Sequence, residues 1–495
     1  MLGVHPGILI VLILLISAFI SPVLDQFKFK RFSLLAIIIS GIIFILSILF
    51  MVRVNSLGIE YYNFGGWSPD KGIEFVFGNL EALMLLLISG MFFLVYIYNQ
   101  YKIRDEINTH LRGWYFTLAF LLQASLNGMI LTNDLFNMFV FIEISALTTV
   151  AIISINENRD TIFASIKYLF LTTLGSSSIL FSIGLIYLIT GYLNMDLAGV
   201  ELIEMSGMYP AATGMAMLFM FFGLAMKSAL FPLHIWLPDA YASAPIISTV
   251  IMAGIVGKAY IVVFIKVFYK VLSLNFFELT NLSEITIFLA GMAIIIGSLF
   301  AIGQTKIKRM LAYSSVAQIG YIFLGLALAT ESSLTGGILH IINHSVNKSL
   351  LFLTVGIIIM YAGVENIEDF SGVGKKYPFT MLLFGLGSLA MVGIPPLNGF
   401  MSKWTIIMGT LEADKPVYLV IILLSSLLNG VYYLPIIIQS FFGGSDDLTY
   451  NWEFKRLGFK IIFPMLTLAI IILLIGIFPS YPLNYINKIV INLMN

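Results

Sequence analysis

Long apolar stretches, each followed by a short polar one, run along the whole chain. A helix needs about 20 apolar residues to cross the hydrocarbon core of a bilayer. Fourteen stretches meet or approach that length, the twelfth with an interruption, and they lie at 4–23, 32–52, 77–98, 113–131, 134–155, 162–190, 212–236, 245–268, 284–302, 311–330, 334–361, 378–410, 417–442 and 461–478. The pattern therefore predicts an all-α polytopic membrane protein with about 14 transmembrane helices.

The polar segments between these stretches are short. Only the segments 53–76, 191–211, 362–377 and 443–460 are long enough for a small surface element, so we expect no soluble domain. The first apolar stretch has no basic residue before it and no cleavage pattern of small residues, and a signal peptide would have both. We expect it to be a retained helix rather than a cleaved leader.

The composition supports the membrane class and narrows the chemistry. The 495 residues are 59% hydrophobic and 11% charged, whereas soluble domains carry about 25% charged residues. The net charge of +0 implies no nucleic-acid partner. The absence of cysteine excludes disulfides, thiolate metal sites and cysteine-ligated iron–sulfur clusters. We predict no cofactor, metal, redox or hydrolytic site in this chain, so any redox chemistry would take place in another subunit.

Basic residues indicate the orientation, because cytoplasmic loops are enriched in lysine and arginine. With an external N-terminus, 15 basic residues fall in internal loops and 6 in external segments or at external helix ends. Lys266 and Lys270, at the end of the eighth stretch, are among these 6. The count predicts that both termini are external.

The seventh stretch contains a proline among apolar residues and has charged groups around it. Lys227 lies five residues before Pro232, His234 and Asp239 follow the proline, and Lys258 lies in the next apolar stretch. Proline removes a backbone hydrogen bond and breaks or kinks a helix. The freed carbonyls are tolerated at membrane depth only where they face protein or water. We therefore predict a broken helix with a buried cation beside it.

Charged residues inside predicted spans are expensive. On the insertion scale each costs roughly 2.5–3.5 kcal/mol, so six cost about 15–20 kcal/mol and must pair, contact water or titrate. The five basic residues are all lysines, which unlike arginine can lose a proton near neutral pH when buried. The six residues are Lys167, Lys227, Lys258, Lys348, Lys403 and the single acid Glu143.

The eleventh stretch carries His340, His344 and Lys348 at a spacing of four. That spacing places all three on one slowly drifting face of a helix, over about 12 Å. Because histidine titrates near neutral pH, such a stripe suits proton passage. The alternative is a pair of buried histidines with satisfied hydrogen bonds. Haem ligation is disfavoured, because the histidines share one helix and have no facing histidine pair.

Two short segments resemble each other. KYLFLTTLG begins at Lys167 and KSLLFLTVG at Lys348, and they share four residues at offsets 0, 2, 6 and 8. The stretches that contain them are five apart, so the two copies would run in opposite directions. The twelfth stretch, five after the seventh, is also interrupted, at 393–399, and Lys403 follows. Inverted repeats with discontinuous helices are typical of transporters, so we predict two inverted repeats with broken helices 7 and 12.

The runs KSALFPLHIWLPDAYASAP, HIINHSVNKSLLFL and GIPPLNGFMSKW resemble the antiporter-like subunits of respiratory complex I and its relatives. The chain is most similar to the D-type subunit of Mrp-type sodium/proton antiporters and to the equivalent subunit of archaeal membrane-bound hydrogenase-type complexes. The resemblance covers spans 4 to 13 and implies inverted repeats of helices 4–8 and 9–13. It divides the chain into 1–112 (helices 1–3), 113–270 (first repeat), 271–442 (second repeat) and 443–495 (a loop and helix 14).

The resemblance also implies roles for the buried charges. Glu143 matches the family's glutamate on helix 5, and Lys227 matches its lysine on helix 7. Lys258 matches the lysine on helix 8. His344 and Lys348 match the family's relay on helix 11, and Lys403 matches its lysine on helix 12. His340 belongs to the same candidate path.

Lys167 is a candidate for the internal entrance, with snorkelling to the interface as the alternative. Two departures from the family pattern stand out. After SAP the chain has Ile246 and Ile247 where the family has a small residue and a second proline, so the entrance to helix 8 is expected to differ in shape. The chain ends soon after the fourteenth span, so we expect it to lack the long lateral helix of the distal complex I subunit.

The function that these features predict is proton translocation by one membrane subunit of a multisubunit ion-pumping complex. Its expected partners are other membrane subunits, protons, the lipid bilayer and, as an open alternative, sodium ions. The expected location is the plasma membrane of a prokaryote. The first rival hypothesis is a stand-alone secondary transporter of a small solute, which predicts a compact pocket. The second is a non-conducting scaffold subunit, which should not retain lysines whose burial in the membrane costs free energy.

Overall fold

The computed structural model describes residues 5–26, 32–272, 281–444 and 457–494. Thirteen helices in these ranges are long and apolar enough to cross a membrane. The chain is therefore a multi-pass membrane protein built almost entirely of helices, as the hydrophobic pattern predicts. The interrupted twelfth stretch forms two shorter helices, α17 (Pro378–Val392) and α18 (Asn398–Glu412).

The chain forms two compact units, which consist of 1–228 with 255–282 and 492–495, and of 229–254 with 283–491. The helices of the first unit are α1 (Pro6–Gln26), α2 (Phe32–Leu57), α3 (Asn79–Glu106), α4 (Arg112–Leu131), α5 (Leu135–Ser154), α6 (Arg159–Thr190), α7 (Met195–Met205), α8 (Pro210–Lys227) and α11 (Gly257–Lys266). Besides α17, α18 and most of α22 (Ser480–Met494), the second unit contains α9 (Leu237–Ser243), α10 (Ile246–Ile251), α13 (Leu282–Ile302), α14 (Ile307–Ala327), α15 (Glu331–Ala362), α16 (Val373–Lys376), α19 (Val417–Phe442) and α21 (Phe459–Ile477). This division into packed units does not test the repeat boundaries, which remain a prediction.

Side chains at the start of several helices define where those helices begin. Asp134 accepts a hydrogen bond from the backbone N–H of Asn137 and caps α5, and Asn158 does the same for α6 through Thr161. Such caps satisfy backbone donors that a helix start leaves open. At the end of α6, Gly191 has φ 75°, a left-handed conformation that glycine adopts without steric cost.

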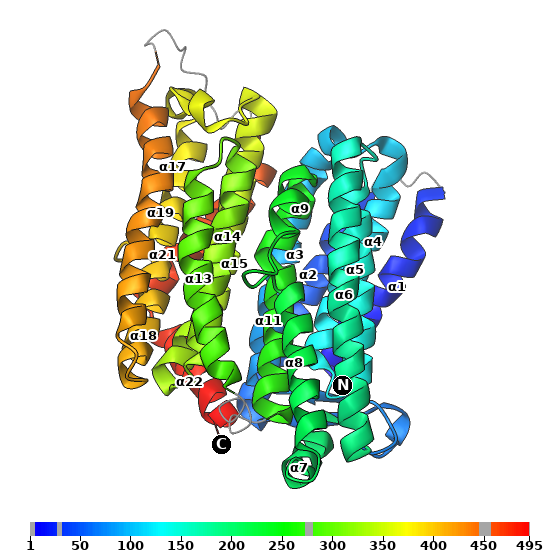
Figure 1. Ribbon diagram of the computed structural model, residues 1–495. Helices are drawn as coiled ribbons and strands as arrows, with labels where there is room; N and C mark the ends of the chain where they lie inside the picture. The colour runs from blue at the N-terminus through cyan, green and yellow to red at the C-terminus, as the bar shows by residue number, and fades with distance from the viewer. Residues whose placement is uncertain (1–4, 27–31, 273–280, 445–456, 495) are drawn as a thin grey trace. The chain divides into compact units, whose positions relative to one another are not determined.

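In the first unit α6 and α8 lie side by side (Figure 1). A Cβ at Gly223 would lie 2.5 Å from the carbonyl oxygen of Gly175, so the two helices approach more closely than a side chain would permit. Small residues allow such approach in membrane helix pairs. The outer face of α6 exposes Phe163, Ile166 and Phe170, as a lipid-facing helix does.

In the second unit α15 is the central helix. It packs against α14, α17, α18 and α21, and every residue from Ser333 to Ile358 is buried. A helix buried all round belongs to the interior of a bundle rather than to its surface. The histidine and lysine stripe of the eleventh stretch is therefore enclosed by protein.

Both predicted breaks occur. The helix of the seventh stretch ends at Lys227, and the next helix, α9, begins at Leu237. The second break separates α17 from α18 between Val392 and Asn398. The inverted relation between the two halves, by contrast, is a prediction that stays open.

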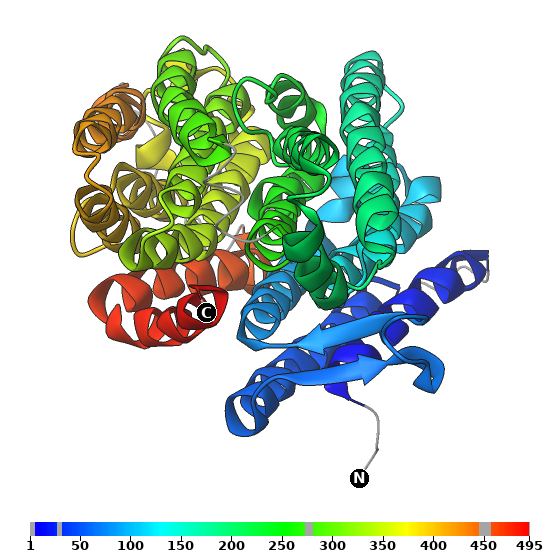
Figure 2. The ribbon, with the colours of Figure 1, turned by 60° about the horizontal axis from the view of Figure 1, so that its bottom comes forward.

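Smaller elements fill the longer loops. A hairpin of β1 (Glu60–Asn63) and β2 (Glu74–Phe77) pairs Glu60 with Phe77, and Figure 2 shows its two antiparallel arrows. The eighth span contains π-helical turns at Met252–Val256 and Val267–Val271, which sequence periodicity did not indicate. Helix α22, after the last span, was not anticipated either.

Candidate functional site

Glu143 and Lys227 form an ion pair in the first unit. Glu143 lies on α5, and Lys227 is the last residue of α8, where the helix breaks. Lys227 Nζ is 3.6 Å from Glu143 Oε1, with 0% of the lysine side chain and 31% of the glutamate side chain exposed. A buried ammonium needs such a partner, because desolvation penalises an isolated charge. The structure thus brings together two of the eight candidate residues.

Hydroxyl groups and an aromatic ring surround this pair. The ammonium of Lys227 lies 5.9 Å from the ring centroid of Tyr260, and the Tyr260 hydroxyl is 2.7 Å from Ser145 Oγ. Tyr168 of α6 lies near the Tyr260 hydroxyl. Both tyrosines are fully buried. The surroundings of Lys227 therefore include groups that can accept and donate a proton.

Lys258 and Lys167 lie on helices next to this pair. Lys258 is 3% exposed and follows the first π-helical turn by two residues, on the same helix as Tyr260. π-Helical turns within helices are frequent at functional sites. Lys167 is half-buried on α6, directly before Tyr168. Both lysines thus belong to the first unit.

His340, in the second unit, is bonded on both ring nitrogens. Its Nδ1 lies 2.9 Å from Ser402 Oγ and its Nε2 lies 3.0 Å from Gln318 Oε1. Because an amide oxygen only accepts, we assign the ring hydrogen to Nε2, and Nδ1 then accepts from the serine. This arrangement matches the alternative interpretation, a neutral buried histidine with satisfied hydrogen bonds.

His344 is stacked near His340. The two ring centroids are 6.3 Å apart and the ring planes differ by 16°. His344 is 1% exposed, and Lys348 on the next turn is fully buried. The spacing of four in the sequence thus places these rings on one face of α15, as predicted.

Neutral acceptors hold the two lysines of the second unit. Lys348 Nζ donates to the Leu311 carbonyl at 2.7 Å and to Ser314 Oγ. Lys403 Nζ donates to the carbonyls of Met391 and Val392, at 2.9 and 3.0 Å. These two carbonyls end α17 at the break, where the helix dipole favours a cation.

Lys266, which the basic-residue count placed among external segments and helix ends, is a buried charge. It is 3% exposed and its Nζ donates to the carbonyls of Ile130 and Thr132, at 2.6 and 2.7 Å. Glu81 Oε1 lies 3.4 Å away. Lys266 is the last residue of α11 and contacts carbonyls at the end of α4, so its burial and its partners are what the sequence did not indicate.

A polar network continues from this point. Lys270 Nζ lies 2.8 Å from both Asp196 Oδ1 and Asn133 Oδ1. Glu74 Oε2 accepts hydrogen bonds from Asn133 and Asn194, at 2.7 and 2.9 Å. Burial and pairing of these groups stabilise the junction of the hairpin with α4, α5 and α7.

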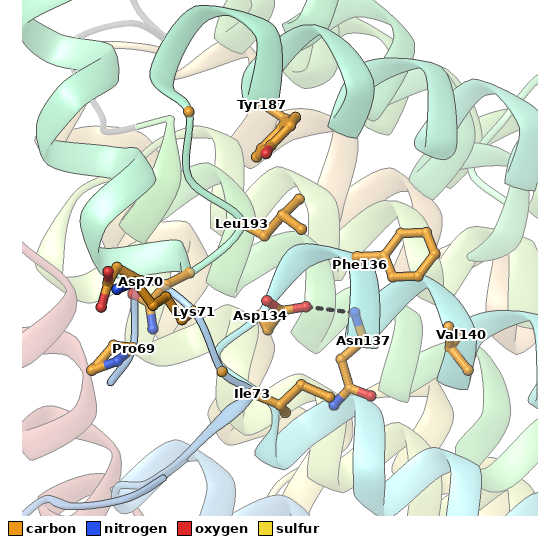
Figure 3. A pocket seen from close by; sticks show the side chains of 13 residues that line it. Pro69, Asp70, Lys71, Ile73, Asp134, Phe136, Asn137, Val140, Tyr187 and Leu193 are labelled. Carbon is orange, nitrogen blue, oxygen red and sulfur yellow. Dashed lines mark hydrogen bonds between the residues drawn. The ribbon is translucent and has the colours of Figure 1, made fainter. Parts of the chain in front are cut away.

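A cavity of about 430 Å³ lies beside this network (Figure 3). Its lining includes Asp134, Asn137, Lys71 and Asn194, but none of the eight candidate residues. Burial raises the pKa of the Asp134 carboxyl above its usual range. Within the described ranges, no group of three or more histidine, aspartate or glutamate residues is placed to hold a metal ion.

Comparisons with known proteins agree with this architecture. Residues 132–429 match the family described as NADH:quinone oxidoreductase/Mrp antiporter, TM. The chain is 34% identical to the N-type subunit of NADH-quinone oxidoreductase from Desulforudis audaxviator, covering 96% of each chain. It is 29% identical to the D-type subunit of a Na(+)/H(+) antiporter from Alkalihalophilus pseudofirmus, covering 87% of this chain and 86% of the relative.

A solved structure is similar over its full length. It is a chain of the membrane-bound sulfane sulfur reductase, an archaeal respiratory membrane complex, and the identity is 32%. The superposition covers 99% of this chain and 98% of the other, with a TM-score of 0.91. The membrane fold described above is therefore shared with a subunit of a respiratory complex.

Proposed function

This chain belongs to the NADH:quinone oxidoreductase/Mrp antiporter membrane family, and from that premise we propose that it is the proton-translocating, antiporter-like subunit of a multisubunit ion-pumping complex. Relatives named as subunits of an oxidoreductase and of an antiporter support this assignment. Its partners are then other membrane subunits, and its location is the plasma membrane of a prokaryote with both termini external. Protons, and sodium ions as an open alternative, are the transported species.

The ion pair at the end of α8 is the observation that carries this proposal. The carboxylate of Glu143 stabilises the charge on Lys227 at 3.6 Å. When Glu143 takes up a proton, or moves away, the desolvated ammonium loses that support and releases its own proton more readily. The pair therefore works as a switch that the rest of the complex can set and reset.

The released proton continues along the other buried groups. We assign the first step to Lys258 in the same unit, and the later steps to His344, Lys348 and Lys403 in the second unit. Carbonyl and hydroxyl groups hold the last two lysines. Neutral acceptors leave no buried carboxylate uncompensated when the proton departs, so the lysine can alternate between its two forms. Lys167 stands at the internal entrance of this path.

The testing experiment replaces Lys227 with arginine in the intact complex, reconstituted in proteoliposomes. Arginine keeps the charge and the pairing with Glu143 but cannot release a proton at accessible pH. We expect ion transport to be abolished while the complex still assembles. Lys415→Arg is the matched control, because Lys415 forms an exposed pair with Glu284. Transport at the native rate by the Lys227→Arg complex would make Lys227 a structural counter-ion and refute the proposal.

The two rival functions are tested with the isolated chain. A stand-alone secondary transporter would build a gradient in liposomes without other subunits, whereas the proposal expects little activity from the chain by itself. A scaffold subunit would tolerate replacement of its buried lysines in the complex. Transport by the purified chain at the rate of the complex would favour the stand-alone transporter.

A further inference from the structure

The cavity beside the hairpin lies where α5 begins (Figure 3). Its volume is about 430 Å³, and its lining includes three charged side chains. Asp70 and Lys71 belong to the loop between β1 and β2 and are exposed, whereas Asp134, the cap of α5, is buried. Because a membrane-spanning helix begins near the level of the lipid headgroups, we expect the cavity at that level.

The amide side chains of this lining already have hydrogen-bond partners. Asn137 Nδ2 donates to Thr132 Oγ1 at 2.9 Å, and Asn194 Nδ2 donates to Glu74 Oε2 at the same distance. The charges of the lining, one ammonium and two carboxylates, therefore decide what the cavity can bind. A complementary ligand carries an anionic group for the ammonium and a cationic group for the carboxylates.

A second hollow adjoins the cavity and has a different lining. Its volume is about 180 Å³, and it shares Ile73 and Asn137 with the cavity. Apart from Asn137 its lining is apolar, and it includes Phe141 of α5 and four residues of α1, the first being Ile8 and the last Leu15. This part of α1 is about 10 Å long, so the hollow is long enough for part of an acyl chain.

Helices α1 and α5 both start at the hairpin. His5, directly before α1, stacks on Phe77 of β2 with 3.7 Å between the ring centroids. Thr132, shortly before α5, pairs with Phe75 of the same strand. Both helices pack against α4, so they flank that helix and run away from the hairpin in the same direction. The charged groups thus lie before the start of α5, and the apolar hollow continues along the helices.

We propose that the cavity and the hollow together bind one phospholipid whose headgroup carries a phosphate and an ammonium. The phosphate pairs with Lys71, the ammonium pairs with the carboxylates of Asp70 and Asp134, and an acyl chain lies between α1 and α5. Charged groups at the helix starts and apolar surface further along follow the order of headgroup and hydrocarbon in a bilayer. The site shares no residue with the proposed proton path, so this inference is independent of the proposed function.

The charge balance favours a headgroup with an ammonium over a purely anionic one. Two carboxylates and one lysine line the cavity, so a headgroup that carries only a phosphate would face an excess of like charge. Burial raises the pKa of Asp134, which means that desolvation of its charged form outweighs the backbone hydrogen bonds that it accepts. A lipid ammonium at this carboxylate supplies the missing opposite charge.

The surface around the cavity favours a lipid over a segment of a partner protein. Phe136 and Val140 of α5 and Tyr187 of α6 line the cavity and are 48%, 39% and 52% exposed. Tyrosine near the end of a span is typical of the membrane interface. A protein segment in this place would bury the charges of Asp70 and Lys71, at a cost in desolvation, whereas a lipid headgroup stays in contact with water.

The test measures which lipid stays bound to the intact complex. The purified complex is incorporated into nanodiscs that contain phosphatidylethanolamine and phosphatidylglycerol in equal amounts, and native mass spectrometry then measures the lipid that remains bound. Both lipids carry a phosphate, but only the first carries an ammonium. We expect phosphatidylethanolamine to be bound about threefold to fivefold more than phosphatidylglycerol, as one partly exposed ion pair contributes that much to binding.

Two substitutions remove the two halves of the site. Lys71→Glu repels the phosphate, and Leu12→Trp fills the apolar hollow. We expect each to lower the bound phosphatidylethanolamine by about fourfold or more, which is the effect of one displaced methylene group. The controls are Lys460→Glu, at an exposed lysine near the start of α21, and Ile20→Trp, since Ile20 and Leu12 are 46% and 44% exposed on the same helix. Both controls should stay within about twofold of the parent.

Equal binding of the two lipids by the parent complex would overturn the proposal. So would binding of phosphatidylethanolamine within about twofold of the parent in the Lys71→Glu and Leu12→Trp complexes. Loss of a subunit from these complexes without a change in bound lipid would show that a protein segment covers the cavity, and would overturn the proposal as well. Because Lys71 and Leu12 are exposed, both variants should fold, and thermal unfolding beside the two controls checks this.

Discussion

In the first unit the ammonium of Lys227 faces a carboxylate, that of Glu143, at 3.6 Å. In the second unit the ammonium of Lys403 faces the carbonyls of Met391 and Val392, a serine hydroxyl and an aromatic ring. Both lysines lie next to a helix break. The two breaks thus hold a buried cation in different ways, one by an opposite charge and the other by neutral dipoles.

The difference indicates separate tasks for the two units. Protonation of Glu143 changes the stability of the charge on Lys227, whereas carbonyl and hydroxyl groups have no charge to change. The sequence reflects this contrast, because Leu-Ala-Met precedes both breaks but is followed by Lys227 in one case and Val392 in the other. Under the proposed function, the first unit is therefore expected to switch and the second to conduct.

The largest effect is expected from Glu143→Ala, which removes the opposite charge from the first unit. Losing one partner of a buried pair costs about 3–5 kcal/mol in soluble proteins. Here the orphaned lysine can instead lose its proton, so the complex should still assemble. We expect transport in proteoliposomes to fall by about a hundredfold or more, because the lysine can no longer cycle.

The control for this change is Glu284→Ala. Glu284 pairs with Lys415 at 2.6 Å, but 57% of its side chain is exposed, so its pair is worth about 0–1 kcal/mol. Equal losses of transport in the Glu143 and Glu284 variants would contradict the hypothesis that the Glu143–Lys227 pair acts as a switch and the Glu284–Lys415 pair does not.

Lys403→Met is expected to have the next largest effect on transport, and a smaller effect on stability than Glu143→Ala. The substitution leaves neutral acceptors without a donor, which lowers the stability of the fold by about 1–3 kcal/mol. It creates no uncompensated charge. Thermal unfolding of the purified complex, measured beside the transport rate, checks both parts. A Lys403→Met complex that is less stable than the Glu143→Ala complex would contradict the contrast drawn between the two units.

The two histidines of α15 are expected to differ. His340 is satisfied on both nitrogens by Ser402 and Gln318, so His340→Gln should change transport by less than about threefold. His344→Gln should lower transport by about tenfold or more, because it removes a titratable group from the relay. Equal transport rates in the two variants would show that their hydrogen bonding does not separate a structural histidine from a conducting one.

The smallest effect is expected at the surface of the first unit. Arg53 donates to both carboxylate oxygens of Glu60 and thereby lowers the pKa of Glu60 below its usual value near 4.5. A lowered pKa means that the pair stabilises the folded state above pH 4.5 and that this contribution is lost as the pH falls through the folded value.

Glu60→Gln should therefore reduce stability by about 0–1 kcal/mol at neutral pH and have no effect on stability in strong acid. Transport should be unchanged. Thermal unfolding of the parent and the variant across this pH range checks the sign, and a difference that grows as the pH falls would contradict it.

Much of the fold could be predicted from the sequence because hydrophobicity and proline act locally. The spans follow from runs of apolar residues, and Pro232 and the Pro395-Pro396 pair mark both breaks regardless of what packs around them. The lysines inside the spans were equally visible, since each lies within a long, predominantly apolar stretch. The burial of Lys266 could not be predicted, because its partners Ile130, Thr132 and Glu81 come from helices distant in the chain.

The sequence by itself determined that this chain crosses the membrane many times, has two helix breaks marked by prolines and carries lysines within its spans. Only the tertiary structure decided which of them have a charged partner. Glu143 reaches Lys227 across 84 positions of the chain, and Ser402 and Gln318 enclose His340 from two other helices. The physical reason is that hydrogen bonds form only within a few tenths of an ångström of their ideal length, so they depend on how each helix is rotated against its neighbours. That rotation is set by packing between segments distant in the chain, which no local pattern records.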